Sequence, residues 1–233
     1  MEAWLEWARG PLFRAAFIFM VLGLIRHVVL TVWEVTAIMR RAGDKAFPFS
    51  RIAKATVVWL FPIGQLKNRW YYGVMTIVFH VAIILVPIFL LGHIALWQRG
   101  LGVSWPGLPN AWADLLTIVA VITALGLVIQ RTVARDTRAL GRFQDYALPL
   151  IIAVPFATGF LVMHPAVNPL GYEATMLAHV LSANLVLILI PLTKLNHCVL
   201  LPTTQLVSEV SWHFPPDAGE QVGVALQKEN ETI

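Results

Sequence analysis

The chain has 233 residues, of which 58% are hydrophobic and 13% are charged, and its mean hydropathy is +0.72. About a quarter of a soluble domain is charged, so this composition excludes an ordinary soluble protein and indicates an integral membrane protein. The single cysteine, Cys198, excludes a disulfide framework and leaves no Cys-x-x-Cys pair for zinc or an iron–sulfur cluster. The net charge of +4 comes from basic residues in loops between apolar runs, a pattern of membrane orientation rather than of nucleic-acid binding.

Five apolar runs are long enough to cross a bilayer, and we expect each to be a helix because a backbone in lipid has to satisfy its own hydrogen bonds. The predicted spans are residues 12–39, 70–98, 112–132, 146–164 and 173–198. The sequence therefore predicts an all-α integral membrane protein, with a five-helix membrane domain over residues 1–205 and a polar tail over residues 206–233. We expect the first span to be retained rather than removed as a signal peptide.

Basic residues gather in two of the four connections between these spans. Between the first and second spans they are Arg40, Arg41, Lys45, Arg51, Lys54, Lys67 and Arg69, and between the third and fourth spans they are Arg131, Arg135, Arg138 and Arg142. In the other two connections, Arg99 is the only basic residue. By the positive-inside rule, the N-terminus lies outside the cell and the C-terminal tail lies in the cytoplasm.

Two further segments have less definite predictions. Residues 55–66 are apolar but too short to span, so we expect an interfacial or re-entrant segment there. The polar tail is either a disordered end or a docking strand for a cytoplasmic partner.

Four histidines fall within the second and fifth spans, where ionisable groups are rare and usually line a bundle interior or a pathway. The two spans run in opposite directions, so His93 and His179 lie at the outer depth, and His80 and His197 at the inner depth. Two such pairs on antiparallel helices are suited to two bis-histidine haems. The alternative is that these histidines form interhelical hydrogen bonds, the role that we favour for His27 and His164.

The spacing of these histidines in the sequence determines on which face of a helix each one lies. His179 and His197 are 18 residues apart, which is five turns, so a continuous helix would present both on one face. His80 and His93 are 13 residues apart, roughly 140° around a straight helix. Pro87, midway between them, predicts a kink or local unwinding that corrects part of this angle.

The five spans, the "FH" and "GH" of the second span and the histidines 18 apart in the fifth resemble the gamma subunit of respiratory nitrate reductase. The proline between two histidines 13 apart and the segment "KLNHCVLLP" at 194–202 look more like the membrane cytochromes b of dissimilatory sulfite reductase-linked and heterodisulfide reductase complexes. The resemblance covers about residues 12–205.

The resemblance implies two b haems, one ligated by His80 with His197 and the other by His93 with His179. It also implies a quinone site near the outer haem, where Gly92 beside His93 matches the nitrate reductase pattern. The quinone-site lysine of that family has no counterpart here, and Arg99 is the basic residue nearby.

Polar residues near these positions suggest further roles. Arg26, deep within the first span, needs a partner in lipid, and a haem propionate would serve as one. His164 is a candidate to line the outer quinone pocket, and it lies with Asp114 and Glu173 at the outer surface, where a quinol would lose protons. No nucleophile–base set, phosphate loop or carboxylate pair indicates chemistry beyond haem and quinone redox.

The sequence therefore predicts a dihaem cytochrome b subunit of a quinone-linked oxidoreductase complex in a prokaryotic cytoplasmic membrane. It would carry electrons between menaquinone, or another quinone, and a cytoplasmic iron–sulfur subunit. We expect this partner because the chain has no cysteine cluster of its own to hold an iron–sulfur centre. The alternatives are a formate dehydrogenase or hydrogenase membrane cytochrome b, and a haem-free anchor or proton-relay transporter.

Overall fold

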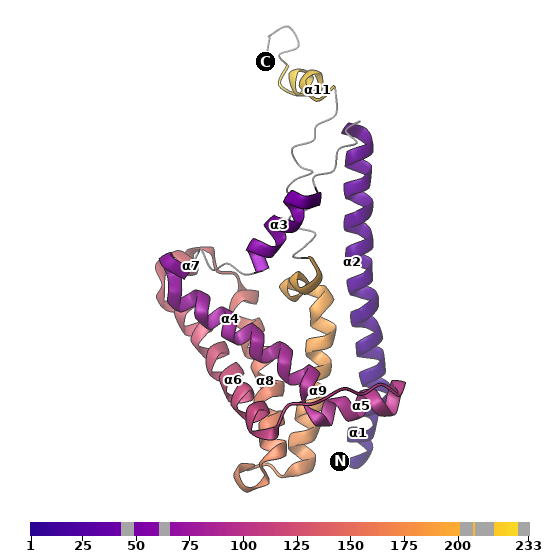
Figure 1. Cartoon of the computed structure of the whole chain (residues 1–233), viewed down its shortest axis with the longest axis vertical. Coiled ribbons are helices and arrows are strands. Elements are labelled where there is room, and N and C mark those ends of the chain that lie inside the picture. Colours follow the sequence, from indigo (N-terminus) through magenta and orange to yellow (C-terminus); the bar gives the residue numbers. More distant parts are fainter. Residues whose placement is uncertain (43–48, 61–65, 201–206, 208–216, 228–233) are drawn as a thin grey trace. The chain divides into compact units, whose positions relative to one another are not determined.

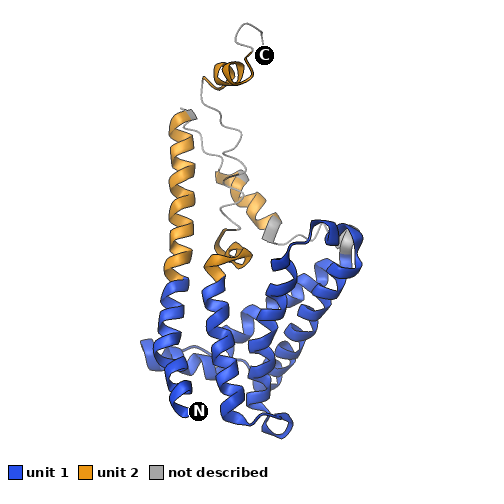
Figure 2. Cartoon of the chain, turned by 180° about the vertical axis from the view of Figure 1, so that it is seen from behind, with its two compact units in different colours: residues 1–20, 63–189 blue, residues 21–62, 190–233 orange. Residues whose placement is uncertain are grey.

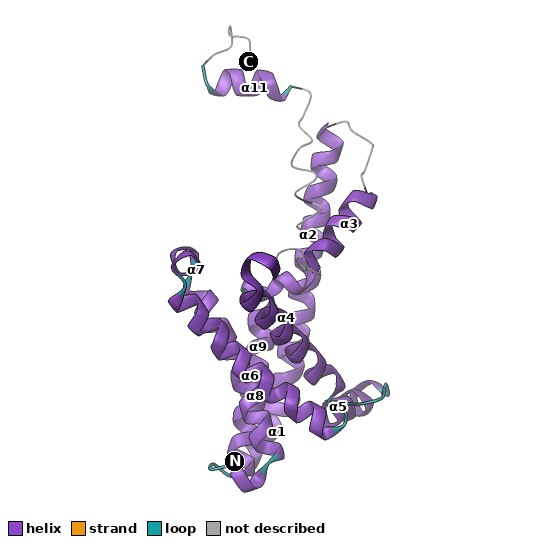
Figure 3. Cartoon of the chain, turned by 60° about the vertical axis from the view of Figure 1, so that its left-hand side comes forward, coloured by secondary structure: helices purple, strands orange, loops and turns teal. Residues whose placement is uncertain are grey.

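The structure, a computed structural model, describes residues 1–42, 49–60, 66–200, 207 and 217–227 (Figure 1). These residues are largely helical and contain no β-strand (Figure 3). The elements in chain order are α1 (Glu2–Trp7), η1 (Ala8–Leu12), α2 (Phe13–Ala42), α3 (Phe49–Leu60), α4 (Leu66–Phe89), α5 (Leu91–Leu101), α6 (Asn110–Val133), α7 (Arg135–Leu140), α8 (Phe143–Met163), η3 (Pro165–Val167), α9 (Tyr172–Leu192), η4 (Lys194–Asn196) and α11 (Ala218–Ala225).

Five helical stretches are long and apolar enough to cross a bilayer. They are Glu2–Arg41, Trp70–Phe89, Asn110–Val133, Phe143–Met163 and Tyr172–Leu192. This confirms the predicted all-helical, multi-pass architecture. The side of the membrane on which each terminus lies stays a prediction.

The first span begins earlier than predicted because α1, η1 and α2 follow one another without a loop. The turn η1 between them is π-helical and contains Pro11, which has no N–H to donate. Asn184 of α9, only 2% exposed, donates from Nδ2 to the Ala8 carbonyl at 3.0 Å. This contact ties the π-helical turn to α9, and no sequence pattern predicted it.

The chain divides into two compact units, residues 1–20 with 63–189, and residues 21–62 with 190–233 (Figure 2). In the first unit α4 packs against α6, and α6 packs against α8. The buried residues of α6 are small and recur at helical spacing: Ala113, Thr117, Ala120 and Ala124. Small side chains let neighbouring helices approach closely in a membrane, so this stripe accounts for the central place of α6.

The second predicted span is interrupted, and its helical crossing ends at Phe89 rather than at residue 98. Leu90 is extended (φ −70°, ψ 127°), and α5 starts again at Leu91 in a different direction (Figure 1). The interruption lies three residues after Pro87. The local unwinding expected near Pro87 is therefore found, and it interrupts the helix completely at Leu90.

The break frees three carbonyls that a continuous helix would have bonded, and each finds another donor. The carbonyl of Pro87 lies 3.1 Å from His93 Nδ1. The Ile88 carbonyl accepts from the Trp105 indole at 3.0 Å, and the Phe89 carbonyl accepts from the backbone N–H of Leu108 at 2.8 Å. Because unpaired carbonyls in lipid are costly, these three donors stabilise the break.

The fifth span also ends earlier than predicted, at Leu192 rather than at residue 198. In a continuing helix the Leu195 N–H would reach the Pro191 carbonyl, but it donates instead to the Thr193 hydroxyl at 3.3 Å. The extended Thr193 (φ −129°) then starts the short helix η4. The prediction that His179 and His197 share one face of a continuous helix is therefore wrong.

The two less definite segments are partly described. Helix α3 includes the first half of the segment predicted to be interfacial, and its 12 residues are too few to span a bilayer. In the tail, residues 218–225 form the helix α11, and docking of the tail on a partner stays a prediction. Residues 61–65, 206, 208–216 and 228–233 of these two segments lie outside the described part of the chain.

Replacing Trp105 by Phe removes the indole N–H from the Ile88 carbonyl. Leaving this helix-end carbonyl without a donor costs about 1 kcal/mol, so we expect the free energy of unfolding in detergent to fall by this amount. Trp112 is the matched control, because it is 59% exposed. Equal losses in W105F and W112F would show that the indole of Trp105 does not cap the break.

Candidate functional site

The structure brings His93 of α5 and His179 of α9 together within the first unit. The centroids of their imidazole rings are 6.1 Å apart, and the ring planes differ by only 11°. Both side chains are part-exposed rather than enclosed. The predicted outer pair is thus a real juxtaposition of two rings from different helices, although α5 no longer continues α4.

Each of these rings is oriented by a backbone carbonyl. His93 Nδ1 lies 3.1 Å from the Pro87 carbonyl oxygen, and His179 Nδ1 lies 2.8 Å from that of Pro155 in α8. A carbonyl can only accept, so both Nδ1 atoms carry the proton. A neutral imidazole holds one proton, which leaves Nε2 of each ring with a free lone pair. This is the form in which histidine binds a metal.

Gly159 of α8 makes room for the His179 ring. A Cβ atom at this position would lie 3.0 Å from His179 Cε1 and 3.1 Å from Nδ1, closer than ordinary van der Waals contact. Arg9, which no sequence pattern singled out, lies in η1 close enough to His179 for an electrostatic interaction.

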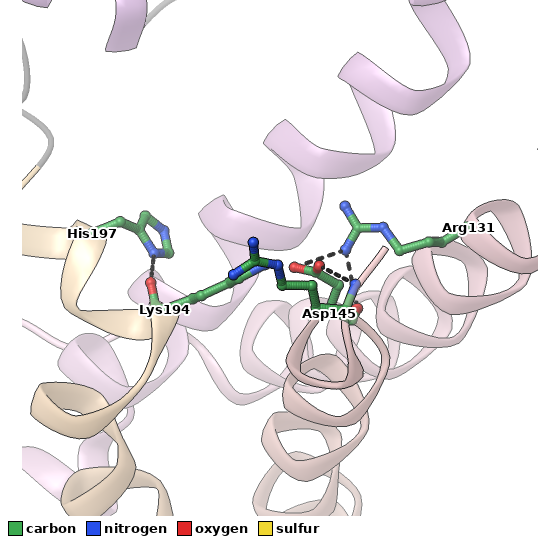
Figure 4. Close-up of polar contacts among 5 residues, drawn as sticks. Arg131, Asp145, Lys194 and His197 are labelled. Atoms are coloured by element: carbon green, nitrogen blue, oxygen red, sulfur yellow. Dashed lines mark hydrogen bonds and ion pairs between the residues drawn. The ribbon is translucent and has the colours of Figure 1, made fainter. Parts of the chain in front are cut away.

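The predicted inner ligands lie in different units. His80 of α4 belongs to the first unit, is half-buried, and its Nδ1 lies 2.7 Å from the Thr76 carbonyl oxygen. His197 belongs to the second unit, is exposed, and its Nδ1 lies 2.7 Å from the Lys194 carbonyl oxygen (Figure 4). Pairing of His80 with His197 stays a prediction, but both rings use Nδ1 toward the backbone, as His93 and His179 do.

His164 and Asp114 meet at one end of the α6–α8 pair. His164 Nε2 lies 3.4 Å from Asp114 Oδ2, and the two side chains are 35% and 36% exposed. His164 Nδ1 lies 2.9 Å from the Phe160 carbonyl oxygen, and its ring stacks on that of Phe160 with centroids 4.1 Å apart. The sequence indicated that both residues are outer-surface groups but did not predict their contact.

The other predicted site residues are less engaged. Gly92 lies next to His93 in open surroundings, where an added Cβ atom would meet nothing within 4 Å beyond its own helix backbone. Arg99 donates from Nε to the Ala95 carbonyl of its own helix at 3.1 Å. Arg26 is exposed on α2 in the second unit. Their predicted contacts with quinone and haem propionate stay predictions.

His27 has the interhelical role that we favoured for it from the sequence. Its Nε2 donates to the Pro191 carbonyl at 2.8 Å, which is the carbonyl that Leu195 leaves free at the end of α9. A Cβ atom at Gly23 would lie 2.5 Å from Pro191 Cβ, so only glycine allows this approach. Within the second unit, Gly23 and His27 therefore hold the end of α9 against α2.

Asp145 is a structural residue that the sequence-based predictions missed. Its Oδ2 accepts from the Arg142 backbone N–H at 2.9 Å at the start of α8, and its Oδ1 lies 3.4 Å from Arg131 Nη1 (Figure 4). An acidic residue three positions into a helix is a known capping pattern, so its spacing from Arg142 was the available signal. The pair joins the end of α6 to the start of α8.

Among the described residues, no group of three or more His, Cys, Asp or Glu side chains is placed to hold a metal ion. The fold and site thus define a multi-pass, all-helical membrane protein with a two-histidine site. The chain is 31% identical to a protein of Nitratidesulfovibrio vulgaris (strain Hildenborough) over 197 residues, which cover 82% of this chain and 85% of that protein, and it belongs to the same family. No family model and no solved structure matches the chain.

Replacing His27 by Phe removes the donor to the Pro191 carbonyl. Interhelical hydrogen bonds in membranes contribute about 1 kcal/mol, so the free energy of unfolding in detergent should fall by this amount. His27→Gln, which keeps an N–H donor, should lose less. Thr31→Val is a matched control because Thr31 bonds only the carbonyl of His27 in its own helix; a loss in T31V equal to that in H27F would contradict the assignment.

Proposed function

We propose that the chain is a dihaem cytochrome b subunit that carries electrons between a membrane quinone and a cytoplasmic iron–sulfur subunit of a respiratory complex in a prokaryotic membrane. The observation that carries this proposal is the pair of His93 and His179, whose rings are 6.1 Å apart and nearly parallel. Sequence composition and the five apolar helices supply the membrane context.

The distance between these two rings would allow both to hold one haem iron. A metal–imidazole bond is about 2 Å long and a ring centroid lies about 1 Å behind its nitrogen, so two imidazoles on opposite sides of a metal have centroids about 6 Å apart. A porphyrin already provides four nitrogens, so two histidines complete the coordination. Two histidines would therefore be enough to hold a haem here, and among the described residues no third side chain is placed with them to hold an ion without a porphyrin.

The chain's own residues would set the properties of this site. The Pro87 and Pro155 carbonyls hold the proton of each ring on Nδ1, which directs Nε2 to the metal and raises its basicity. Gly159 keeps space for the His179 ring. With both axial positions filled by histidine, a haem supplies one-electron transfer rather than oxygen binding.

We assign His80 and His197 to a second haem. The support is that both rings turn Nδ1 to a backbone carbonyl, as the outer pair does. Arg26 would serve as a bidentate partner of a haem propionate, which would offset the cost of an arginine in lipid. We place the quinone near Gly92, Arg99 and His164, close to the outer pair.

Electrons would have to leave this chain through another subunit. The one cysteine, Cys198, provides no cluster site, so a cytoplasmic iron–sulfur partner is part of the proposal. The predicted orientation places His197 on the side of that partner. Quinol oxidation near His93 and His179 would then move electrons inward across the membrane.

The spectrum of the purified full-length chain tests this proposal. A dithionite-reduced minus oxidised difference spectrum should show b-type haem, with two haems per chain. His197→Ala should keep one of them, and His213→Ala, a histidine of the polar tail, should keep both. A wild-type chain without a b-type signal would contradict the function, and two haems in H197A would contradict the inner pair.

A further inference from the structure

We propose that Asp114 and His164 form the proton-accepting site for quinol oxidation in this chain, an inference that rests on the proposed function. The two residues belong to different helices, α6 and the end of α8, and meet with His164 Nε2 3.4 Å from Asp114 Oδ2. Each side chain keeps about a third of its surface exposed, so a substrate in the surrounding lipid or water can reach it.

The geometry makes this pair a site that takes up a proton. The Phe160 carbonyl, 2.9 Å from His164 Nδ1, can only accept, so the proton of the neutral ring is on Nδ1. His164 Nε2 and Asp114 Oδ2 are then two acceptors that face each other without a hydrogen between them. Binding one proton at Nε2 turns this contact into an imidazolium–carboxylate pair. The contact between two acceptors, which is unfavourable, thereby becomes an attractive, charged hydrogen bond.

Stacking on Phe160 fixes the position of the ring. The centroids are 4.1 Å apart and the planes differ by 20°, so His164 has little freedom to turn Nε2 away from Asp114. His164 is also the residue that follows the last turn of α8, next to Pro165, where the backbone is no longer helical. The His164 side of the proton site is therefore preorganised.

Helix α8 links this pair to the proposed outer haem ligands. Gly159 lies against the His179 ring, and the next residue, Phe160, holds His164 by its ring and its carbonyl. Adjacent residues of one helix thus support the electron-accepting site and the proton-accepting site. Oxidation of a quinol requires both within reach of one molecule.

The reaction balances with these groups. Oxidation of one quinol to quinone breaks two O–H bonds and releases two electrons and two protons. The two ferric haems of the proposed function would take up the two electrons, one each. His164 Nε2 takes up the two protons one after the other, and each passes by way of the Asp114 carboxylate to water on the exposed side before the next arrives. His164 is thus the proposed catalytic base and Asp114 its proton-accepting partner.

Haem reduction in the full-length chain tests the inference with two reductants. In stopped-flow experiments, menadiol reports the quinol-dependent step, and dithionite reports electron entry that needs no base. We expect His164→Gln to slow reduction by menadiol about 100-fold, and Asp114→Asn about 10-fold, because a positioned base contributes about 10²–10⁴. Reduction by dithionite and haem content should stay as in the wild type, which also shows that the variants fold.

Two further variants make the result specific. Glu173→Gln removes a carboxylate from the first turn of α9 that makes no ion pair with the described residues, and it should reduce at the wild-type rate. His164→Gly should regain part of the lost rate when free imidazole is added, which a purely structural role of His164 would not allow.

The outcomes separate this inference from the proposed function. Equal menadiol rates in wild type, H164Q and D114N would overturn the inference and leave the dihaem assignment in place. A slow H164Q that also loses haem, while D114N reduces at the wild-type rate, would assign His164 a structural role and overturn the inference too. A wild-type chain without haem would overturn both.

Discussion

A backbone carbonyl within a membrane helix has to find a donor, and this constraint shapes both the fold and the site. Where α4 ends at Phe89, three carbonyls lose their helical partners. The side chains of His93 and Trp105 and the backbone of Leu108 replace those partners. The bond to His93 has a second consequence, because it decides which nitrogen of the imidazole carries the proton. One contact thus closes the helix break and prepares a metal ligand.

The same exchange occurs at the end of α9 with a different result. The Leu195 N–H donates to Thr193 instead of to the Pro191 carbonyl. That carbonyl accepts a hydrogen bond from His27 Nε2. A histidine that is protonated on Nδ1 would offer Nε2 to a metal. In His27, Nε2 is already used for this hydrogen bond. In contrast, His80, His93, His164, His179 and His197 all direct Nδ1 to a backbone carbonyl. His27 thus differs from these five histidines in the ring nitrogen that it turns to the backbone.

The sequence predicted the features that depend on composition and on helical repeat. Apolar run lengths specify five helical crossings, because bilayer thickness fixes the length of a span. Because the second and fifth spans run in opposite directions, we predicted that His93 and His179 lie at one depth. The structure places their rings next to each other. Pro87 predicted a distortion between His80 and His93, and a break follows it. These predictions needed no knowledge of side-chain contacts.

The features that the sequence did not predict depend on contacts between distant residues. Whether a helix ends at Leu192 or continues to His197 depends on whether another donor takes the Pro191 carbonyl, and that donor lies 164 positions away. Trp105 as a cap, Asn184 at the Ala8 carbonyl and the meeting of Asp114 with His164 are likewise set by packing. Periodicity in one helix carries no information on such partners.

The central claim is that His93 and His179 ligate the same haem, and haem content of three variants tests it most directly. If they share one haem, His93→Ala and His179→Ala each leave one haem per chain, and the double variant also leaves one. If the two single variants each lose one haem but the double variant loses both, the histidines ligate different haems and the account is wrong.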